Sequence, residues 1–159
     1  MNHTHPIVGH IHLTVADLDR ALSFYRDLLG FEVSARYGDS AVFLSSGGYH
    51  HHIGLNTWAG TDAKPAPAGH TGMYHVAFLY PTRKSLANAL KRIVDAEYPL
   101  EGASDHGVSE AIYLKDPDGN GVEIYVDRPR DTWNVSNDGM VEMVTERLDI
   151  QDLLLQADS

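Results

Sequence analysis

The sequence predicts an α+β fold in which two copies of a β-α-β-β-β module pair into one curved mixed sheet with the helices outside. Three observations predict it. A strand-then-helix pattern near the N-terminus recurs after residue 72. Sliding the chain by 65 residues superimposes the two first strands and helices, and sliding it by 70 places Ala41–Leu44 on Ala111–Leu114 with hydrophobic character kept. One module cannot cover its own sheet, so the two modules are expected to pair.

The composition limits the classes of function. The 159 residues are enough for one domain with its own core, and the 43% hydrophobic content is ordinary. The absence of Cys excludes disulfides and thiolate metal sites, and the formal charge of −10 opposes nucleic-acid binding. No long apolar run or signal-like N-terminus is found, so we expect a cytoplasmic protein with no membrane association. Ten His stand out, because imidazole is both a common metal ligand and a common acid–base group.

The first module is predicted over residues 7–58. Alternation from His10 to Val15 indicates a strand that carries His10 and His12 on one face. The segment after it has apolar residues at helical spacing, beginning at Asp17 or Asp19 and ending at Gly30. Three short strands are then expected between Gly- and Ser-containing turns, at residues 31–36, 41–45 and 50–57.

The second module is predicted over residues 72–128, after a linker rich in Gly, Ala and Pro at residues 59–72. A strand at 73–79 precedes a helix at 81–96, and three more strands follow near 100–104, 109–115 and 121–127. The inward face of the helix is predicted to consist of Leu86, Leu90, Ile93 and Val94. Together the modules make one domain at 7–130, followed by an extension at 131–159 that ends in a short helix.

The last strand carries an unusual carboxylate. The turn Asp116–Asn120 leads into a strand on which Glu123 lies among apolar residues, where a carboxylate is costly to bury unless a cation receives it. The repeat pairs His10 with His75 in the first strands, and Glu123 with Ile53 in the last strands. Three ligand side chains and one hydrocarbon indicate a two-His, one-carboxylate Fe(II) site, with Mn(II) as the alternative metal, inside the curved sheet. Taken singly, each His could be a structural strand residue and Glu123 a solvated acid.

At this point the residues resemble a known family. Gly9–Leu13, Tyr74–Phe78 and Asp116–Asn120 with Glu123 are similar to the vicinal-oxygen-chelate superfamily, which includes glyoxalase I, methylmalonyl-CoA epimerase, bleomycin-resistance proteins and extradiol ring-cleaving dioxygenases. The likeness covers roughly residues 7–130. The Ser104–Ser109 region and the tail with Trp133 look most like the catechol-2,3-dioxygenase branch of bacterial aromatic degradation.

The resemblance also implies roles for individual side chains. It implies that His51 is the acid–base group, and that His106 and Tyr113 hydrogen-bond the oxygen substrate. His12 and Ile53 are expected to line the substrate pocket. Other interpretations stay open: His50, His51 and His52 could be an exposed polar edge, His12 could support the site from outside it, and Tyr113 could be a core aromatic.

These implications lead to one predicted activity and two alternatives. The predicted protein is an extradiol dioxygenase that opens a catechol-type aromatic diol with O₂ at Fe(II). The first alternative is a glyoxalase- or epimerase-like lyase or isomerase, whose relatives generally use four protein ligands. The second is a non-catalytic small-molecule binding protein of the bleomycin-resistance type. Exposed sheet edges and the apolar face of the tail helix predict a homo-oligomer.

Overall fold

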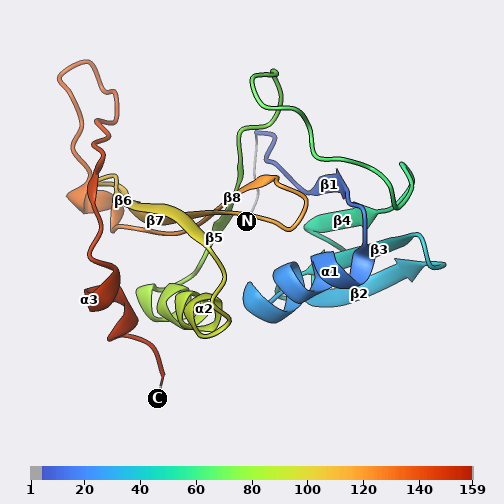
Figure 1. Cartoon of the computed structure of the whole chain (residues 1–159). Helices are drawn as coiled ribbons and strands as arrows, with labels where there is room; N and C mark the ends of the chain where they lie inside the picture. Colours follow the sequence, from blue (N-terminus) through green and yellow to red (C-terminus); the bar gives the residue numbers. More distant parts are fainter. Residues whose placement is uncertain (1–4, 159) are drawn as a thin grey trace. The chain divides into compact units, whose positions relative to one another are not determined.

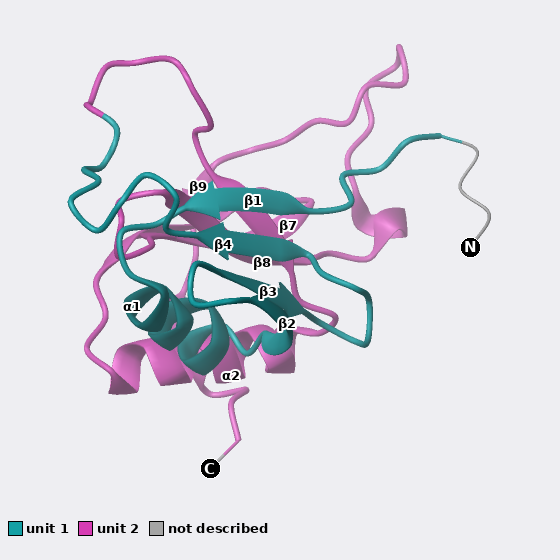
Figure 2. Cartoon of the chain, turned by 90° about the vertical axis from the view of Figure 1, so that its right-hand side faces the viewer, with its two compact units in different colours: residues 1–66 teal, residues 67–159 magenta. Residues whose placement is uncertain are grey.

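The computed structural model describes residues 5–158 and divides into two compact units, Met1–Ala66 and Pro67–Ser159 (Figure 2). Each unit has its own mixed sheet and helices, so the predicted α+β class is confirmed. The strands form two separate sheets, of four and five strands, and not the single sheet that was predicted. The reason is that β1 (Ile11–Thr14) and β5 (Val76–Leu79) each pair with the last strand of their own module and stand at a sheet edge.

Unit 1 contains the predicted strand-helix-strand order. Asp17 caps the first helix by accepting a hydrogen bond from the Arg20 backbone N–H at 2.8 Å, as expected for an N-cap aspartate. The sheet order is β1-β4-β3-β2, with β1 parallel to β4 and the other pairs antiparallel (Figure 2). The further elements are α1 (Leu18–Leu22), which continues into a π-helical stretch (Ser23–Leu28), β2 (Glu32–Tyr37), β3 (Ala41–Ser45) and β4 (Ile53–Asn56).

Unit 2 repeats this arrangement and adds to it. Its sheet order is β5-β8-β7-β6-β9, and the helix α2 begins after a capping box made by Thr82 and Ser85. Leu86, Leu90 and Ile93 are buried as predicted, but Val94 is 43% exposed, in the last turn of the helix next to its final residue Asp95. The elements are α2 (Arg83–Asp95), β6 (Leu100–Asp105), β7 (Ser109–Lys115), β8 (Gly121–Asp127), a 3₁₀ turn (Arg130–Thr132), β9 (Glu146–Arg147) and α3 (Ile150–Leu154).

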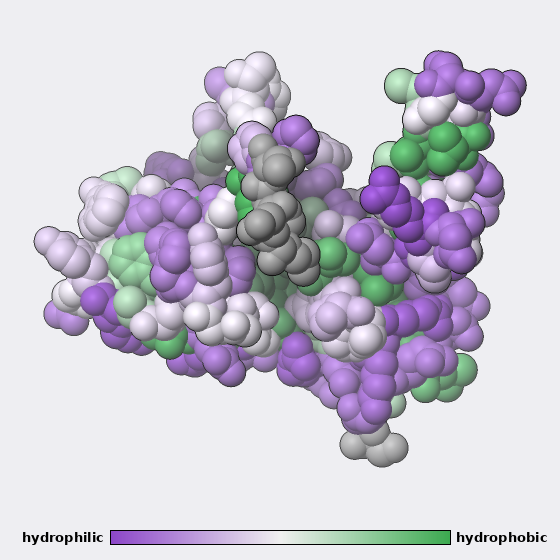
Figure 3. Space-filling model, turned by 180° about the vertical axis from the view of Figure 1, so that it is seen from behind, coloured by the Kyte–Doolittle hydropathy of each residue, from purple (hydrophilic) through white to green (hydrophobic). Residues whose placement is uncertain are grey.

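The C-terminal part of unit 2 consists of an exposed arm, residues 133–145, followed by β9 and α3. The arm projects from the surface in Figure 3, with hydrophobic side chains exposed along it. The chain then returns to the sheet through β9, and α3 packs beside α2 with Leu153 fully buried (Figure 1). The predicted tail helix is therefore present. Within residues 5–158, none of the helices is both long enough and apolar enough to span a bilayer.

Candidate functional site

A tight turn and a glycine place Glu123 beside His75 in unit 2. The Asp116 carboxylate accepts from the backbone N–H groups of Asp118 and Asn120, at 3.0 and 2.8 Å, which closes the turn before β8. A Cβ atom at Gly121 would lie 2.1 Å from the Tyr74 carbonyl oxygen, so only glycine allows this close approach. The approach brings the backbone just before β5 against the start of β8.

His75 and Glu123 meet at this point. His75 Nε2 and Glu123 Oε2 are 2.9 Å apart, and Glu123 is only 8% exposed. Burial raises the pKa of the Glu123 carboxyl, and the nearby His75 opposes that rise. His75 Nδ1 is also buried, and it makes no hydrogen bond within the part of the chain that the structure describes. A cation bound between the Glu123 carboxylate and the His75 imidazole would offset the cost of burying the carboxylate charge.

The two side chains fit the chemistry of a divalent metal. Imidazole nitrogen and carboxylate oxygen are the donors of the two-His, one-carboxylate type of site. At 2.9 Å, His75 Nε2 and Glu123 Oε2 are within hydrogen-bonding distance, so the two donor atoms face each other. Unit 2 thus supplies two of the three predicted ligands, already adjacent.

Tyr113 and His106 extend this arrangement. Tyr113 on β7 is the cross-strand partner of Glu123 on β8, and its ring centroid lies 5.9 Å from that of His75. The Tyr113 hydroxyl oxygen is 2.6 Å from His106 Nε2. Burial, and then the Glu123 charge, raise the pKa of Tyr113 above its ordinary value, so its hydroxyl stays protonated at neutral pH. The structure therefore brings four predicted site residues of unit 2 together.

Unit 1 carries the other predicted residues. The rings of His10 and His51 lie 4.4 Å apart between centroids, and the His51 ring also contacts Phe43 at 5.0 Å. His50 Nδ1 and His51 Nδ1 are 2.8 Å apart, so one of them donates to the other. Burial, followed by the neighbouring imidazoles, lowers the pKa of His51. Among residues 5–158, no group of three or more His, Asp or Glu side chains that could hold a metal ion is assembled. The three predicted ligands are divided between the units, with His10 in unit 1 and both His75 and Glu123 in unit 2.

The strand registers correct one prediction. Ile11 pairs with Ile53 in unit 1, and the corresponding pair in unit 2 is Val76 with Val122. The residue equivalent to Glu123 is therefore Gly54, one position after the predicted Ile53. Ile53 is fully buried and shares the sheet face of Ile11, opposite to the face of His12. The predicted equivalence of Ile53 with Glu123 is therefore wrong, because a slip of one residue moves a side chain to the other face.

Gly54 explains where the His12 ring lies. A Cβ atom at Gly54 would lie 2.9 Å from two atoms of that ring, so the ring occupies the space that a side chain would need. The ring also lies 5.9 Å from Phe43 and 5.5 Å from Trp58, measured between centroids. The sequence interpretation missed Gly54, although a glycine inside a strand signals close approach by another group. It also missed the Val144 carbonyl, which binds His106 Nδ1 at 2.7 Å and has no side-chain signal.

Comparisons with known proteins agree with this architecture. Residues 7–124 match the family model described as the glyoxalase/bleomycin resistance protein/dioxygenase superfamily. The chain is 40% identical over 151 residues to a catechol-2,3-dioxygenase of Bacillus subtilis (strain 168), covering 94% of this chain and 52% of that protein. It is 30% identical to a biphenyl-2,3-diol 1,2-dioxygenase 3 of Rhodococcus globerulus, covering 77% of this chain and 64% of the relative. The chain thus spans less than two thirds of either relative.

A solved structure shows the same fold at low sequence identity. The crystal structure of a glyoxalase/dioxygenase from Nostoc punctiforme superimposes with a TM-score of 0.63 at 19% identity. The superposition covers 77% of this chain and 92% of the other. Such a likeness speaks for the fold alone.

Proposed function

This chain belongs to the glyoxalase/bleomycin resistance protein/dioxygenase superfamily, and we propose that it is an extradiol dioxygenase that opens a catechol-type aromatic diol with O₂. The single observation that carries the proposal is the adjacency of His75, Glu123 and the hydrogen-bonded pair Tyr113–His106 in unit 2. Its similarity to relatives named as catechol and biphenyl-diol dioxygenases supports the choice of reaction. His10 of unit 1 is proposed as the third ligand.

The proposed metal is Fe(II), with Mn(II) as the alternative. His10, His75 and Glu123 would hold it through two imidazole nitrogens and one carboxylate. When bound, Fe(II) would supply the redox chemistry that allows O₂ to react with an aromatic diol. A substrate of this class is a small aromatic ring with two neighbouring hydroxyl groups.

The remaining side chains bind and orient, or hold a proton. His51 is proposed to accept a proton from a catechol hydroxyl at a ring nitrogen, a role that suits an imidazole whose pKa is lowered and which is therefore neutral at pH 7. Tyr113 and His106 would position the oxygen substrate through the Tyr113 hydroxyl. His12 is proposed to line the pocket for the ring, because its own ring lies among aromatic side chains.

Gly54 argues against the lyase or isomerase alternative. Those relatives are expected to take a fourth protein ligand from the position equivalent to Glu123 in the first module. Here that position carries a residue without a side chain, and the neighbouring His12 ring lies where a side chain would have to go. A metal held by His10, His75 and Glu123 alone would keep coordination positions for a diol and O₂. The two His and the carboxylate likewise disfavour a purely non-catalytic binding protein.

The activity test is direct. The protein is loaded anaerobically with Fe(II) or Mn(II), and a panel of catechols is then added with O₂. The expected result is a yellow ring-cleavage product from at least one catechol, and none after His75→Ala. Lys84→Ala, which changes an exposed residue of α2 that pairs with Asp158, serves as the matched control and should retain activity. No product from any catechol with either metal would contradict the proposal.

A further inference from the structure

His106 is held at both ring nitrogens. It lies in the turn between β6 and β7, and His106 Nδ1 is 2.7 Å from the Val144 carbonyl oxygen. His106 Nε2 is 2.6 Å from the Tyr113 hydroxyl oxygen. Val144 is 38 residues away in the sequence, in the arm that precedes β9. Thus a segment outside the repeated modules contacts a side chain that we assign to the site.

The chemistry of these two contacts allows one hydrogen arrangement in the neutral ring. A carbonyl oxygen can only accept, so His106 Nδ1 must carry the hydrogen that is donated to Val144. A neutral imidazole has one N–H group, and Nε2 is therefore an acceptor. The Tyr113 hydroxyl must then donate to Nε2. The arm carbonyl thereby fixes the direction of the hydrogen bond between His106 and Tyr113.

The backbone around Val144 is held against the same turn. The Val144 N–H donates to the His106 carbonyl oxygen at 3.1 Å, and a Cβ at Gly107 would lie 3.4 Å from Val144 Cγ2. Immediately after it, β9 pairs antiparallel with the end of β6, Ser104 opposite Arg147. Leu148 is buried directly after β9. Val144 is therefore placed by several contacts and is not a loose end that happens to lie near the ring.

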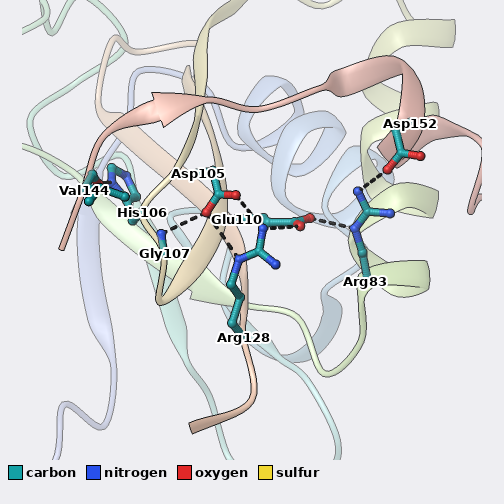
Figure 4. Close-up of polar contacts among 8 residues, drawn as sticks. All are labelled: Arg83, Asp105, His106, Gly107, Glu110, Arg128, Val144 and Asp152. Atoms are coloured by element: carbon teal, nitrogen blue, oxygen red, sulfur yellow. Dashed lines mark hydrogen bonds and ion pairs between the residues drawn. The ribbon is translucent and has the colours of Figure 1, made fainter. Parts of the chain in front are cut away.

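A network of hydrogen bonds and ion pairs joins the turn that carries His106 to the helix α3 (Figure 4). The Asp105 carboxylate accepts from the Gly107 N–H at 2.8 Å and from Arg128. Arg128 also donates to the buried Glu110 at 3.0 Å. Glu110 accepts in turn from Arg83 Nε at 2.7 Å, and Arg83 Nη2 donates to Asp152 of α3 at 2.7 Å. The residue before His106 and the helix after the arm are thus tied to the same charged cluster.

We propose that residues 144–147 are a positioning segment for His106. The Val144 carbonyl selects the Nδ1–H tautomer of His106, and thereby makes Tyr113 the donor and His106 the acceptor of the hydrogen bond between them. The importance of this for catalysis rests on the proposed function, in which both side chains act on the substrates. The tautomer itself does not depend on that function.

The test reads the tautomer without any activity. The full chain is prepared with ¹⁵N-labelled histidine and without Fe(II), because paramagnetic iron broadens signals. Long-range ¹H–¹⁵N correlation then identifies which nitrogen of each ring carries hydrogen, and His106→Gln assigns the signal. The expected result is Nδ1–H in the parent protein. His106 with hydrogen on Nε2 alone would overturn the proposal.

Three variants separate the arm from other causes. Val144→Pro removes the N–H that binds the His106 carbonyl, and should give a shifted or mixed tautomer. Met143→Pro places the same restriction one residue earlier, where the structure describes no hydrogen bond from the N–H, and should keep Nδ1–H. Tyr113→Phe, which removes only the hydroxyl group, should also keep Nδ1–H. A tautomer that changes in Tyr113→Phe, or that stays the same in folded Val144→Pro, would overturn the proposal.

Turnover adds a readout that a purely structural role would not give. In Fe(II)-loaded protein, Val144→Pro should lower kcat by about 10- to 100-fold relative to Met143→Pro, with KM for the catechol nearly unchanged. In the proposed function the metal would hold the diol and His106 would not, so KM should change little. If the parent cleaves no catechol, the proposed function fails, and the tautomer measurement still decides the positioning role.

Discussion

Units 1 and 2 share one strand arrangement but hold their polar side chains differently. In unit 2, His75, Glu123, Tyr113 and His106 each have a polar partner at 2.6–2.9 Å. In unit 1, His50 and His51 are hydrogen-bonded to each other, His10 contacts His51 through its ring, and the position equivalent to Glu123 is Gly54. A repeated scaffold thus carries two different sets of side chains. The side chains proposed as metal ligands and as the acid–base group therefore lie in different surroundings in the two units.

The largest effect is expected from removing His51, the acid–base group that we propose in unit 1. His51→Ala should lower turnover by roughly 10²–10⁴-fold while metal content stays the same, because a general base is lost and no ligand is. Steady-state kinetics and metal analysis of the same preparations measure both quantities. His50→Ala is the matched control, and its effect on turnover should be below about tenfold. Equal losses of turnover in the two variants would contradict a distinct catalytic role for His51. They would indicate that the neighbouring His side chains act together as a structural cluster.

Truncation of Ile53 tests the corrected register. Ile53→Ala should lower the free energy of unfolding by about 2–4 kcal/mol, since a fully buried side chain is lost from the core of unit 1. Urea denaturation measures the loss, and metal content should be unaffected. If the variant were as stable as the parent but had a changed KM for catechol, Ile53 would contact the substrate. Gly54 would then not be the position equivalent to Glu123.

A side chain at Gly54 should cost less. Gly54→Ala puts a Cβ where it meets the His12 ring at 2.9 Å, so the ring has to move, and we expect a loss of about 1–3 kcal/mol in stability. Gly102→Ala is the control, because a Cβ there meets nothing within 4 Å on β6 of unit 2. Similar unfolding curves for the two variants would show that the His12 ring moves aside at little cost. Packing against His12 would then not require glycine at position 54.

The smallest effect concerns the charged cluster of unit 2. The hydrogen bond from Arg128 lowers the pKa of Asp105, so its stabilising contribution is complete above the ordinary Asp pKa of about 3.9 and is lost as the pH falls through the lowered value. Asp105→Asn should cost about 1 kcal/mol at pH 7 and nothing at pH values below the folded pKa. Asp95→Asn, in an exposed pair, is the control for urea titrations across this range. A cost that persists unchanged in acid would contradict the ionic origin.

Much of the fold follows from local patterns, and the register does not. Hydrophobic periodicity located the strands and helices of both units, because their core faces are regularly spaced. The register failed for Ile53 because Phe43 pairs with Gly54, eleven residues on, whereas Tyr113 pairs with Glu123, ten residues on. The connection is one residue shorter in unit 2, and no hydrophobicity pattern reports such a change. Because of this one-residue shift, the prediction took the core residue Ile53, and not Gly54, as the equivalent of Glu123.

The site was predictable to the extent that it depends on side-chain type. His75, Glu123, Tyr113 and His106 were predicted as site residues, and the structure places them together in unit 2. The Val144 contact could not be predicted, since a backbone carbonyl has no sequence signature and β9 is only two residues long. The network from Asp105 to Asp152 likewise joins residues that are distant in sequence and lie on different elements.

The most direct test of the account is the metal stoichiometry of matched ligand variants from the two units. Purified parent protein, His10→Ala and Glu123→Ala are loaded anaerobically with Fe(II), and bound iron is measured per chain, with His70→Ala as a control from an exposed loop. The account predicts stoichiometric iron in the parent and the control, and its loss in both ligand variants. Full iron content in His10→Ala together with loss in Glu123→Ala would contradict the account, because His10 would then not be a ligand.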